Sequence, residues 1–233
     1  MSVPHLWSAS AQELIEAQLA LAAAEPPAPW SASKDREPAI GACAVIFPRG
    51  LTGSGSRGDR AWAAAAVLRK RCVIAQATVL AQAGAPYVAG LLALREGAAL
   101  EAAVRALTAP PDVLLVDGTG RDHPRRGGMA LHLGAVLDFP TVGVTHRPLL
   151  AEGAWPDDLR GATSPLRLDG ETVGAWLRTR PGTRPLAVHP GWRTDVDTAI
   201  EVVLSATFAH RAPEPFRVAR RLARTARAGA QGG

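Results

Sequence analysis

The chain has 233 residues, of which 47% are hydrophobic, so it is long and apolar enough to bury one sizeable core. No stretch approaches about 18 uninterrupted apolar residues, which excludes a membrane-spanning helix, and two cysteines, Cys43 and Cys72, are too few for a disulfide framework and lack metal-ligand spacing. The formal net charge of +5 comes almost entirely from arginine, because Lys34 and Lys70 are the only lysines.

These properties predict a single domain over residues 1–233, which we expect to be a soluble, cytoplasmic monomer without a membrane partner. The N-terminus shows no cluster of positive charge followed by an apolar segment, so we expect no secretory signal. A surface rich in guanidinium groups suits contacts with phosphate oxygens. A composition biased towards Ala, Arg, Gly and Pro explains the same arginine content, so charge alone leaves nucleic-acid binding open.

Residues 1–38 are expected to hold one helix and a proline-rich lead-in. Ser10 and Glu13 have the spacing of a capping box, and apolar residues then recur at helical spacing, which predicts a helix over residues 10–24. Residues 25–38 are rich in proline and polar side chains, so they are expected to connect this helix to the first strand.

Three apolar segments of strand length follow the lead-in. The first is continuous, as in a strand that is buried on both faces, and the other two flank a basic turn at residues 69–71. We expect the three to form an antiparallel meander. The segments are residues 40–47, 61–68 and 72–80.

Helical and strand patterns alternate in the middle of the chain, which favours parallel pairing beside the meander. The predicted elements are a helix at residues 94–107, a strand at 113–116, a helix at 129–137 and a strand at 141–144. The expected fold class is therefore α/β, with a mixed β-sheet that combines an antiparallel meander with parallel strands and is flanked by helices.

The last third of the chain is predicted to add a hairpin over residues 166–177, with its turn at Asp169 and Gly170. A strand at residues 186–188 and a helix at 195–208 follow. Residues 212–233 form an arginine-rich C-terminal helix and tail, whose arginine face is either a solvated surface or a stripe that follows phosphates. The arginines of this face are Arg217, Arg220, Arg221, Arg224 and Arg227.

The most informative segment begins directly after the buried strand at residues 113–116. Asp117 stands at the carboxyl end of this strand, where open α/β folds bind their ligands. Gly118 and Gly120 let the backbone approach a phosphate or a metal ion closely, and His123 can reach back over the same edge. The alternative is a glycine-rich turn in which Asp117 caps its own loop.

A second segment, residues 86–97, carries a carboxylate and the only tyrosine. Glu96 is expected to open a helix, where the helix dipole favours a carboxylate even without a function. If this segment folds against the strand that ends at Asp117, two oxygen ligands converge and suit Mg²⁺. Tyr87 lies in a tight Pro/Gly loop, where an aromatic ring either wedges between bases or packs in the core.

Four motifs in linear order resemble the endonuclease V family, and the similarity extends from the first helix to the C-terminal helix. Linked motifs at matching spacing make a chance match improbable. The motifs are Tyr-x-x-Gly-Leu-Leu-x-x-Arg-Glu-Gly at residues 87–97, Asp-Gly-x-Gly-x-x-His-Pro-Arg at 117–125, Gly-x-Ala-x-His-x-Gly at 128–134 and Pro-Thr-Val-Gly-Val at 140–144.

The resemblance implies a ribonuclease H-like fold and a Mg²⁺-dependent endonuclease of DNA repair, with Mn²⁺ as an alternative cofactor. It also implies that the partner is single- or double-stranded DNA, or RNA. Such enzymes bind deaminated bases, chiefly hypoxanthine, and cut the second phosphodiester on the 3′ side. Base extrusion is how they inspect a lesion that the duplex conceals.

Residue by residue, the resemblance assigns roles within these motifs. Tyr87 matches the wedge tyrosine, and Glu96 and Asp117 match two acidic metal-site positions. His123 matches the histidine beside them, and His146 falls at the position of a lysine, which completes the expected catalytic set. The expected nucleic-acid contacts besides Tyr87 are Gly90, Leu91, Leu92, Gly118, Gly120 and Arg125.

The chain departs from the family's pattern at three catalytic positions. The family's first-strand aspartate falls on Ala44, its lysine on His146, and the histidine of its Pro-Gly-His on Trp192. Loss of a carboxylate ligand should weaken metal binding, and a histidine that is mostly neutral at pH 7 removes a fixed positive charge. Ala89 also replaces a proline of the wedge loop.

Three interpretations stay open: an endonuclease with weak or metal-shifted activity, a catalytically inactive homologue that binds damaged or inosine-containing DNA or RNA, and altered chemistry. One form of altered chemistry is a softer site for Zn²⁺ or Mn²⁺. Its ligands would be Glu96, Asp117, His123, His146 and His189.

Overall fold

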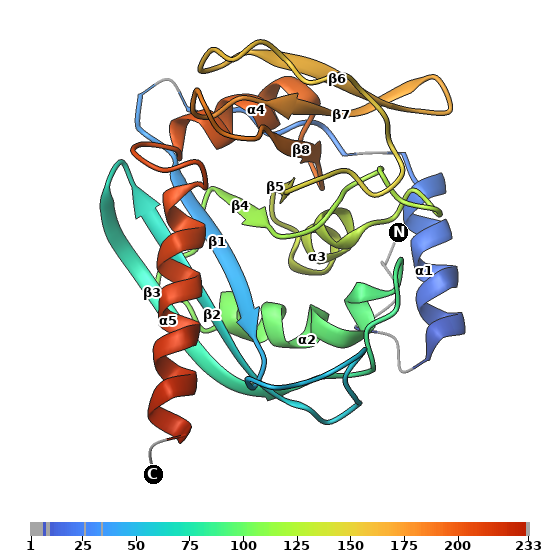
Figure 1. Cartoon of the computed structure of the whole chain (residues 1–233), viewed down its shortest axis with the longest axis vertical. Coiled ribbons are helices and arrows are strands. Elements are labelled where there is room, and N and C mark those ends of the chain that lie inside the picture. Colours follow the sequence, from blue (N-terminus) through green and yellow to red (C-terminus); the bar gives the residue numbers. More distant parts are fainter. Residues whose placement is uncertain (1–6, 8–9, 26, 34, 232–233) are drawn as a thin grey trace.

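The computed structural model describes residues 7, 10–25, 27–33 and 35–231, and these residues form five helices and eight strands (Figure 1). None of the helices in these ranges has the length and apolar character needed to cross a membrane. In chain order the elements are α1 (Ala11–Ala23), β1 (Ala39–Ile46), β2 (Arg60–Arg69), β3 (Cys72–Gln82), α2 (Leu92–Arg105), β4 (Val113–Val116), α3 (Met129–Leu137), β5 (Thr141–Thr145), β6 (Thr163–Leu168), β7 (Glu171–Leu177), β8 (Leu186–Pro190), α4 (Val196–Ser205) and α5 (Glu214–Gln231).

All eight strands belong to one mixed sheet, in the order β3-β2-β1-β4-β5-β8-β7-β6. The first three strands form the antiparallel meander, and β1, β4 and β5 pair in parallel. The three remaining pairs, β5 with β8, β8 with β7 and β7 with β6, are antiparallel. The sequence therefore predicted the fold class correctly, because period-2 and period-3.6 patterns alternate along the chain in the order that this topology requires.

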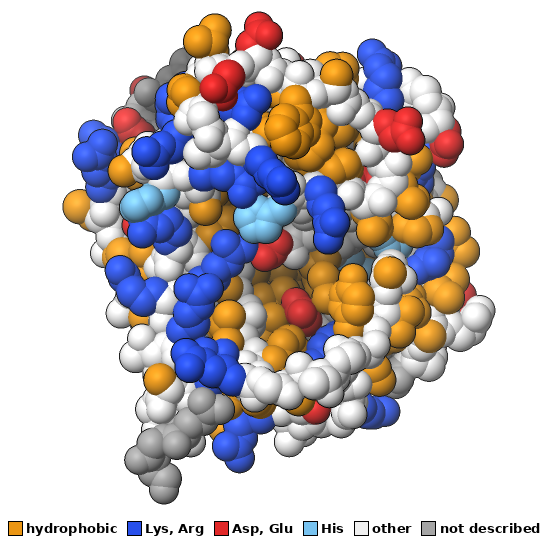
Figure 2. Space-filling model, viewed as in Figure 1, with side chains coloured by type: hydrophobic (Ala, Val, Ile, Leu, Met, Phe, Trp, Pro, Cys, Tyr) orange, Lys and Arg blue, Asp and Glu red, His pale blue; other side chains and the backbone are white. Residues whose placement is uncertain are grey.

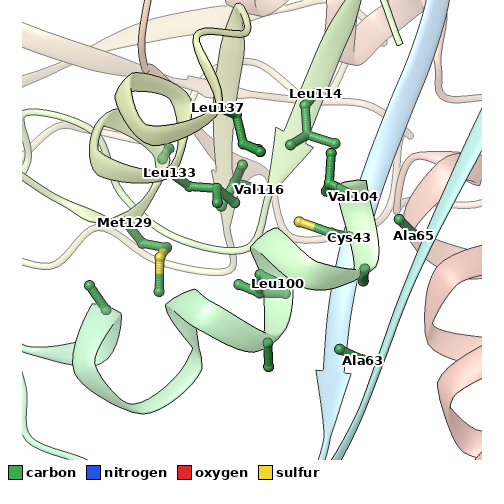
Figure 3. Close-up of a cluster of buried hydrophobic side chains, with 14 of the residues drawn as sticks. Cys43, Ala63, Ala65, Leu100, Val104, Leu114, Val116, Met129, Leu133 and Leu137 are labelled. Atoms are coloured by element: carbon green, nitrogen blue, oxygen red, sulfur yellow. The ribbon is translucent and has the colours of Figure 1, made fainter. Parts of the chain in front are cut away.

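Helices cover both faces of the sheet. On one face, Leu114 and Val116 of β4 lie in a buried cluster with Leu100 of α2 and with residues of α3 (Figure 3). On the opposite face, Val113 and Leu115 pack against α4 and the start of α5. Successive side chains of a strand point to opposite faces, so β4 serves both layers, and burial of each of its side chains contributes about 1.5–3 kcal/mol.

Some boundaries of the elements differ from the prediction. The helix expected at residues 94–107 begins at Leu92, so Glu96 lies in its second turn and not at its opening as expected. The helix expected at 195–208 is shorter, because Ala206 ends α4 and α5 starts after a turn. The predicted hairpin forms, and its turn residues Asp169 and Gly170 have φ angles of 52° and 83°, as a type I′ turn requires.

The register of the sheet brings the ends of two central strands together. Ala42 of β1 pairs with Leu115 of β4, and the same register, continued by two residues, puts Ala44 beside Asp117. Parallel strands present their carboxyl ends at the same edge of a sheet, so Ala44 and Asp117 lie at the edge where open α/β folds bind ligands.

Candidate functional site

Asp117 and Glu96 lie within electrostatic reach of each other at this edge. Burial raises the pKa of the half-buried Glu96 to about 7, and the negative charge of Asp117 adds to the shift. The buried thiol of Cys43 near the end of β1 senses both groups: burial raises its pKa to about 12, with further contributions from Asp117 and then from Glu96. Glu96 and Asp117 are therefore close enough for each charge to influence the other and the Cys43 thiol of β1, and their joint role in a metal site stays a prediction.

Arg220 of α5 forms an ion pair with Asp117, and its Nη2 atom lies 2.7 Å from Oδ2 of the carboxylate. The Cζ atom of the same guanidinium lies 5.1 Å from the centroid of the Phe216 ring. Ala44 is buried under α5, against Val218 and Ala219. Ala44, to which the resemblance assigns the family's first-strand aspartate, is therefore part of the hydrophobic packing between β1 and α5.

A cavity of about 260 Å³ lies between Asp117 and the loop that carries Tyr87. Half of the Tyr87 surface and half of the Val88 surface are exposed, so this aromatic ring is not part of the core. Gly90 has a φ of 77°, a conformation that favours glycine, at the turn into α2. On the face shown in Figure 2 the surface is hollowed near the centre, with acidic side chains inside the hollow and Lys or Arg side chains along the side where α5 runs.

The carbonyl oxygen of Gly90 is the anchor of this loop. It accepts hydrogen bonds from Nη2 of Arg125 at 2.7 Å, from Nε2 of Gln18 at 3.1 Å and from Nε2 of His123 at 3.0 Å. Arg125 also donates from Nε to Oε1 of Gln18 at 2.6 Å. Three side chains from two segments, α1 and the loop after β4, thus fix the position of the Tyr87 loop.

His123 supports the loop, and it also lines the cavity together with Asp117. While Nε2 donates to Gly90, Nδ1 accepts the backbone N–H of Arg125 at 3.2 Å, so both ring nitrogens are engaged. Burial lowers the pKa of His123, which keeps the ring neutral. The guanidinium of Arg125, expected to contact nucleic acid, is likewise directed into the protein. The structure therefore gives both residues a positioning role.

His146 remains near the carboxylate edge. It is exposed in the loop after β5 and lines a small hollow together with Asp117 and Arg220. Its Nδ1 accepts a hydrogen bond from Nη1 of Arg211 at 3.1 Å. Partial burial and the charge of Arg211 lower the pKa of His146, so it is a neutral ring that presents Nε2–H at this edge.

Trp192 does not belong to this edge. It packs against Leu21 of α1 and Leu131 of α3, and its backbone N–H donates to Oγ1 of Thr141 at the start of β5. Because β8 runs antiparallel to β5, residues that follow β8 lie at the opposite end of β5 from His146. The position at which the resemblance expects a histidine therefore lies away from the carboxylate edge.

The side chains at this edge do not fit the metal ion that the resemblance implies. Within the described part of the chain, no three His, Cys, Asp or Glu side chains are grouped so as to hold a metal ion. Ala44 offers no oxygen, and Arg220 already neutralises Asp117. The softer five-residue site also fails to form, because His123 binds the loop and the Nε2 atom of the buried His189 lies 3.2 Å from Oγ1 of Thr145.

Asp122 is a buried residue that shapes the cavity and that the sequence did not reveal. It is fully buried, and its carboxylate accepts the backbone N–H groups of Leu149, Leu150 and Ala151 at 2.7 to 2.8 Å. These bonds fix the loop whose residues Arg147 and Leu149 form one wall of the cavity. Asp122 occupies an unspecified position of the Asp-Gly-x-Gly-x-x-His motif, so no sequence signal marks it.

Comparison with known proteins adds a family relationship to this geometry. The family model described as Endonuclease V matches residues 49–221, which leaves Ala44 outside the match. The endonuclease V of Roseiflexus sp. (strain RS-1) is 43% identical over 172 residues, which are 73% of this chain and 78% of that relative. The crystal structure of the endonuclease V from Streptomyces avermitilis has a TM-score of 0.85 at 34% identity, over 98% of each chain.

A more distant structure shares the same fold. The endonuclease V of Ciona intestinalis, in complex with a 24mer DNA that contains an inosine followed by a ribo-adenosine, has a TM-score of 0.75 at 21% identity. The similarity covers 92% of this chain and 96% of the Ciona chain.

Proposed function

This chain belongs to the endonuclease V family, and we propose that it is a nucleic-acid-binding member that captures a deaminated base, chiefly hypoxanthine, in the cavity beside Asp117. The observation that carries the proposal is the exposed Tyr87 at the rim of this cavity, on a loop that Arg125, Gln18 and His123 hold in place. An aromatic ring in this position replaces a base that leaves the stack. In DNA repair such binding would shield a lesion or recruit other proteins to it.

The first turn of α2 supplies the groups that would read the base. The first N–H groups of a helix have no acceptor within the helix, and Leu92 and Ala93 of this turn line the cavity. Deamination replaces the amino donor of adenine by a carbonyl acceptor, which can accept such an N–H. The same donors leave the amino group of adenine without a partner, so the pocket favours hypoxanthine.

Binding without hydrolysis follows from the groups around Asp117. The implied Mg²⁺ would neutralise charge on the phosphate and activate water, but Ala44 provides no ligand and Arg220 occupies Asp117. Arg220 and the neutral His146 instead present N–H donors towards a phosphate that follows the captured base. These donors bind and orient the phosphate, and they supply no nucleophile.

Hydrolysis at the same position is the second candidate function, and the pKa of Glu96 favours it. A carboxyl group with a pKa of about 7 can accept a proton from water at neutral pH. The guanidinium of Arg220 could then stabilise charge that develops on the phosphate. In that case the chain is a slow endonuclease that cuts on the 3′ side of the deaminated base.

One assay separates the two functions. The substrates are single- and double-stranded DNA oligonucleotides with deoxyinosine or deoxyadenosine, and the corresponding RNA with inosine or adenosine. Each is incubated with the protein in Mg²⁺, Mn²⁺ or EDTA, and binding and nicking are measured in the same samples. We expect selective binding of inosine that persists in EDTA, without nicking. Nicking that disappears in Asp117→Ala would establish the second function. Equal binding of inosine and adenosine strands would refute base capture.

A further inference from the structure

We propose that α5 is a phosphate-binding track that holds the backbone of a nucleic-acid strand outside the base cavity and leads it to Asp117 through Arg220. This inference rests on the proposed function, because it specifies where the captured strand continues. It assigns a ligand, the phosphodiester backbone, to a surface that lies apart from the Tyr87 loop.

The two faces of α5 differ completely in character. Phe216, Ala219 and Ala223 are almost fully buried, and the helix packs on β1 and β2 through them. The arginines lie on the other face. At about 1.5 Å per residue, the interval from Arg217 to Arg227 spans about 15 Å, which is the rise of roughly four phosphates along one strand of duplex DNA.

A groove of about 800 Å³ follows this arginine face. Arg49, from the loop after β1, lines it together with the arginines of α5, and Glu214 is the one acidic residue among its lining residues. The Lys and Arg side chains along the side of the hollow in Figure 2 follow the course of α5 in Figure 1. Cations therefore outnumber anions in the groove, and the groove adjoins the Asp117 edge.

Six arginines line the groove, of which three contact other residues of the protein and three do not. Arg217 pairs with Glu214 at 2.8 Å, Arg220 pairs with Asp117, and Arg227 donates to the carbonyl of Phe47 at 3.1 Å. The other three arginines of the groove form no hydrogen bond or ion pair with any residue that the structure describes. These free cations are Arg49, Arg221 and Arg224.

The arrangement fits a polyanionic strand better than a membrane surface. Like charges one turn apart on a helix repel one another, and a chain of phosphates relieves this repulsion along the whole face. A helix that binds in a membrane interface buries its apolar face in lipid, but the apolar face of α5 is already buried against the sheet. Arg220 lines both this groove and the hollow at Asp117, so the track and the site are continuous.

The test is the salt dependence of binding to an oligothymidine strand, which contains no deaminated base. Each phosphate contact on a single strand contributes about 0.7 to the slope of log K against log salt. We expect the double variant Arg221→Gln/Arg224→Gln to lower this slope by about 1.4. The matched control is Arg105→Gln/Arg167→Gln, which removes the same charge from exposed arginines of α2 and β6, and it should keep the wild-type slope.

Each outcome bears on the track separately from base capture. An unchanged slope in Arg221→Gln/Arg224→Gln overturns the track even if inosine is still preferred. A lowered slope supports the track even if the wild type shows no preference for inosine, in which case base capture fails alone. Equal loss of slope in the control pair, displacement of the strand by polyglutamate at the same charge concentration, or no binding of oligothymidine by the wild type would each overturn it.

Discussion

The guanidinium of Arg220 lies 2.7 Å from the carboxylate of Asp117, although the two residues are 103 positions apart in the chain. The side chain of Asp117 is 55% exposed, so solvent limits the stability that this pair contributes to about 0–1 kcal/mol. Its importance is that a cation of the protein itself occupies the carboxylate that the family's pattern assigns to a metal ion. Changes at this edge should therefore alter metal binding more than folding.

Rebuilding the metal site requires two changes beside Asp117 and one in the loop after β5. Ala44→Asp restores a carboxylate at the end of β1, Arg220→Gln frees Asp117, and His146→Lys restores a fixed positive charge. We expect the triple variant to bind Mg²⁺, measured by calorimetry, and to nick deoxyinosine strands. A folded triple variant that binds the strand, but does not bind Mg²⁺ and does not nick the strand, would contradict the view that these three residues prevent metal binding.

Trp192 serves as the internal control for that rebuilding. Its position at the opposite end of β5 means that Trp192→His should add nothing to the nicking rate of the triple variant. The change should instead destabilise the protein, because it removes the contacts of the indole with Leu21 and Leu131. A nicking rate that depends on this substitution would show that the two ends of β5 communicate.

Tyr87 should account for most of the preference for strands that contain inosine. Stacking of a base on an aromatic ring is worth about 1–3 kcal/mol, so Tyr87→Ala is expected to weaken binding of a deoxyinosine duplex by roughly 5- to 150-fold. Tyr87→Phe keeps the ring and should bind like the wild type in the same anisotropy titration. If both variants bind equally well, the ring does not act as a wedge.

The pKa of Glu96 should make stability depend on pH. Because the folded pKa of about 7 lies above the ordinary value of 4.5, the folded state holds the proton more tightly. The contribution of the protonated Glu96 to the free energy of unfolding is complete below about pH 4.5 and is lost as the pH rises to about 7. This difference in pKa corresponds to at most about 3.4 kcal/mol of unfolding free energy. Urea unfolding at pH 5 and pH 8 should show this fall in the wild type, and Glu96→Gln should remove it.

Arg125 should contribute to stability by clamping the Tyr87 loop. Arg125→Met removes charged hydrogen bonds to Gln18 and to the carbonyl of Gly90, and it should lower the free energy of unfolding by about 2 kcal/mol. Arg224→Met, on the exposed face of α5, is the matched control and should stay within about 0.5 kcal/mol of the wild type. Equal effects in a denaturant titration would mean that the clamp carries no stability.

The sequence predicted the sheet because its order follows from local patterns, and the same patterns placed Asp117 at the end of β4. A continuous apolar strand followed by Asp-Gly-x-Gly places Asp117 at a sheet edge in many α/β folds. Arg220 could not be assigned in the same way, since a face of several arginines does not indicate which one meets a distant carboxylate. Only the packing of α5 over Ala44 decides this.

The place of Trp192 away from the Asp117 edge has a topological reason. A motif at the end of a strand lies at one edge or the other according to the direction of that strand, and β8 runs antiparallel to β5. The linear order of motifs does not record this direction. The catalytic role expected of His123 stays a prediction, and the structure adds a contact of its ring with the carbonyl of Gly90 that the motif does not indicate.

For the proposed capture of a deaminated base, the three N–H groups held by Asp122 have a consequence. With one wall of the cavity fixed by this carboxylate and the other by the Gly90 anchor, the receptor is preorganised, and recognition does not require closure of a lid. The entropic and unstacking penalty then falls on the nucleic acid. Weakly paired or unpaired sites should accordingly be captured first, because local opening of the helix governs the rate of encounter with the base.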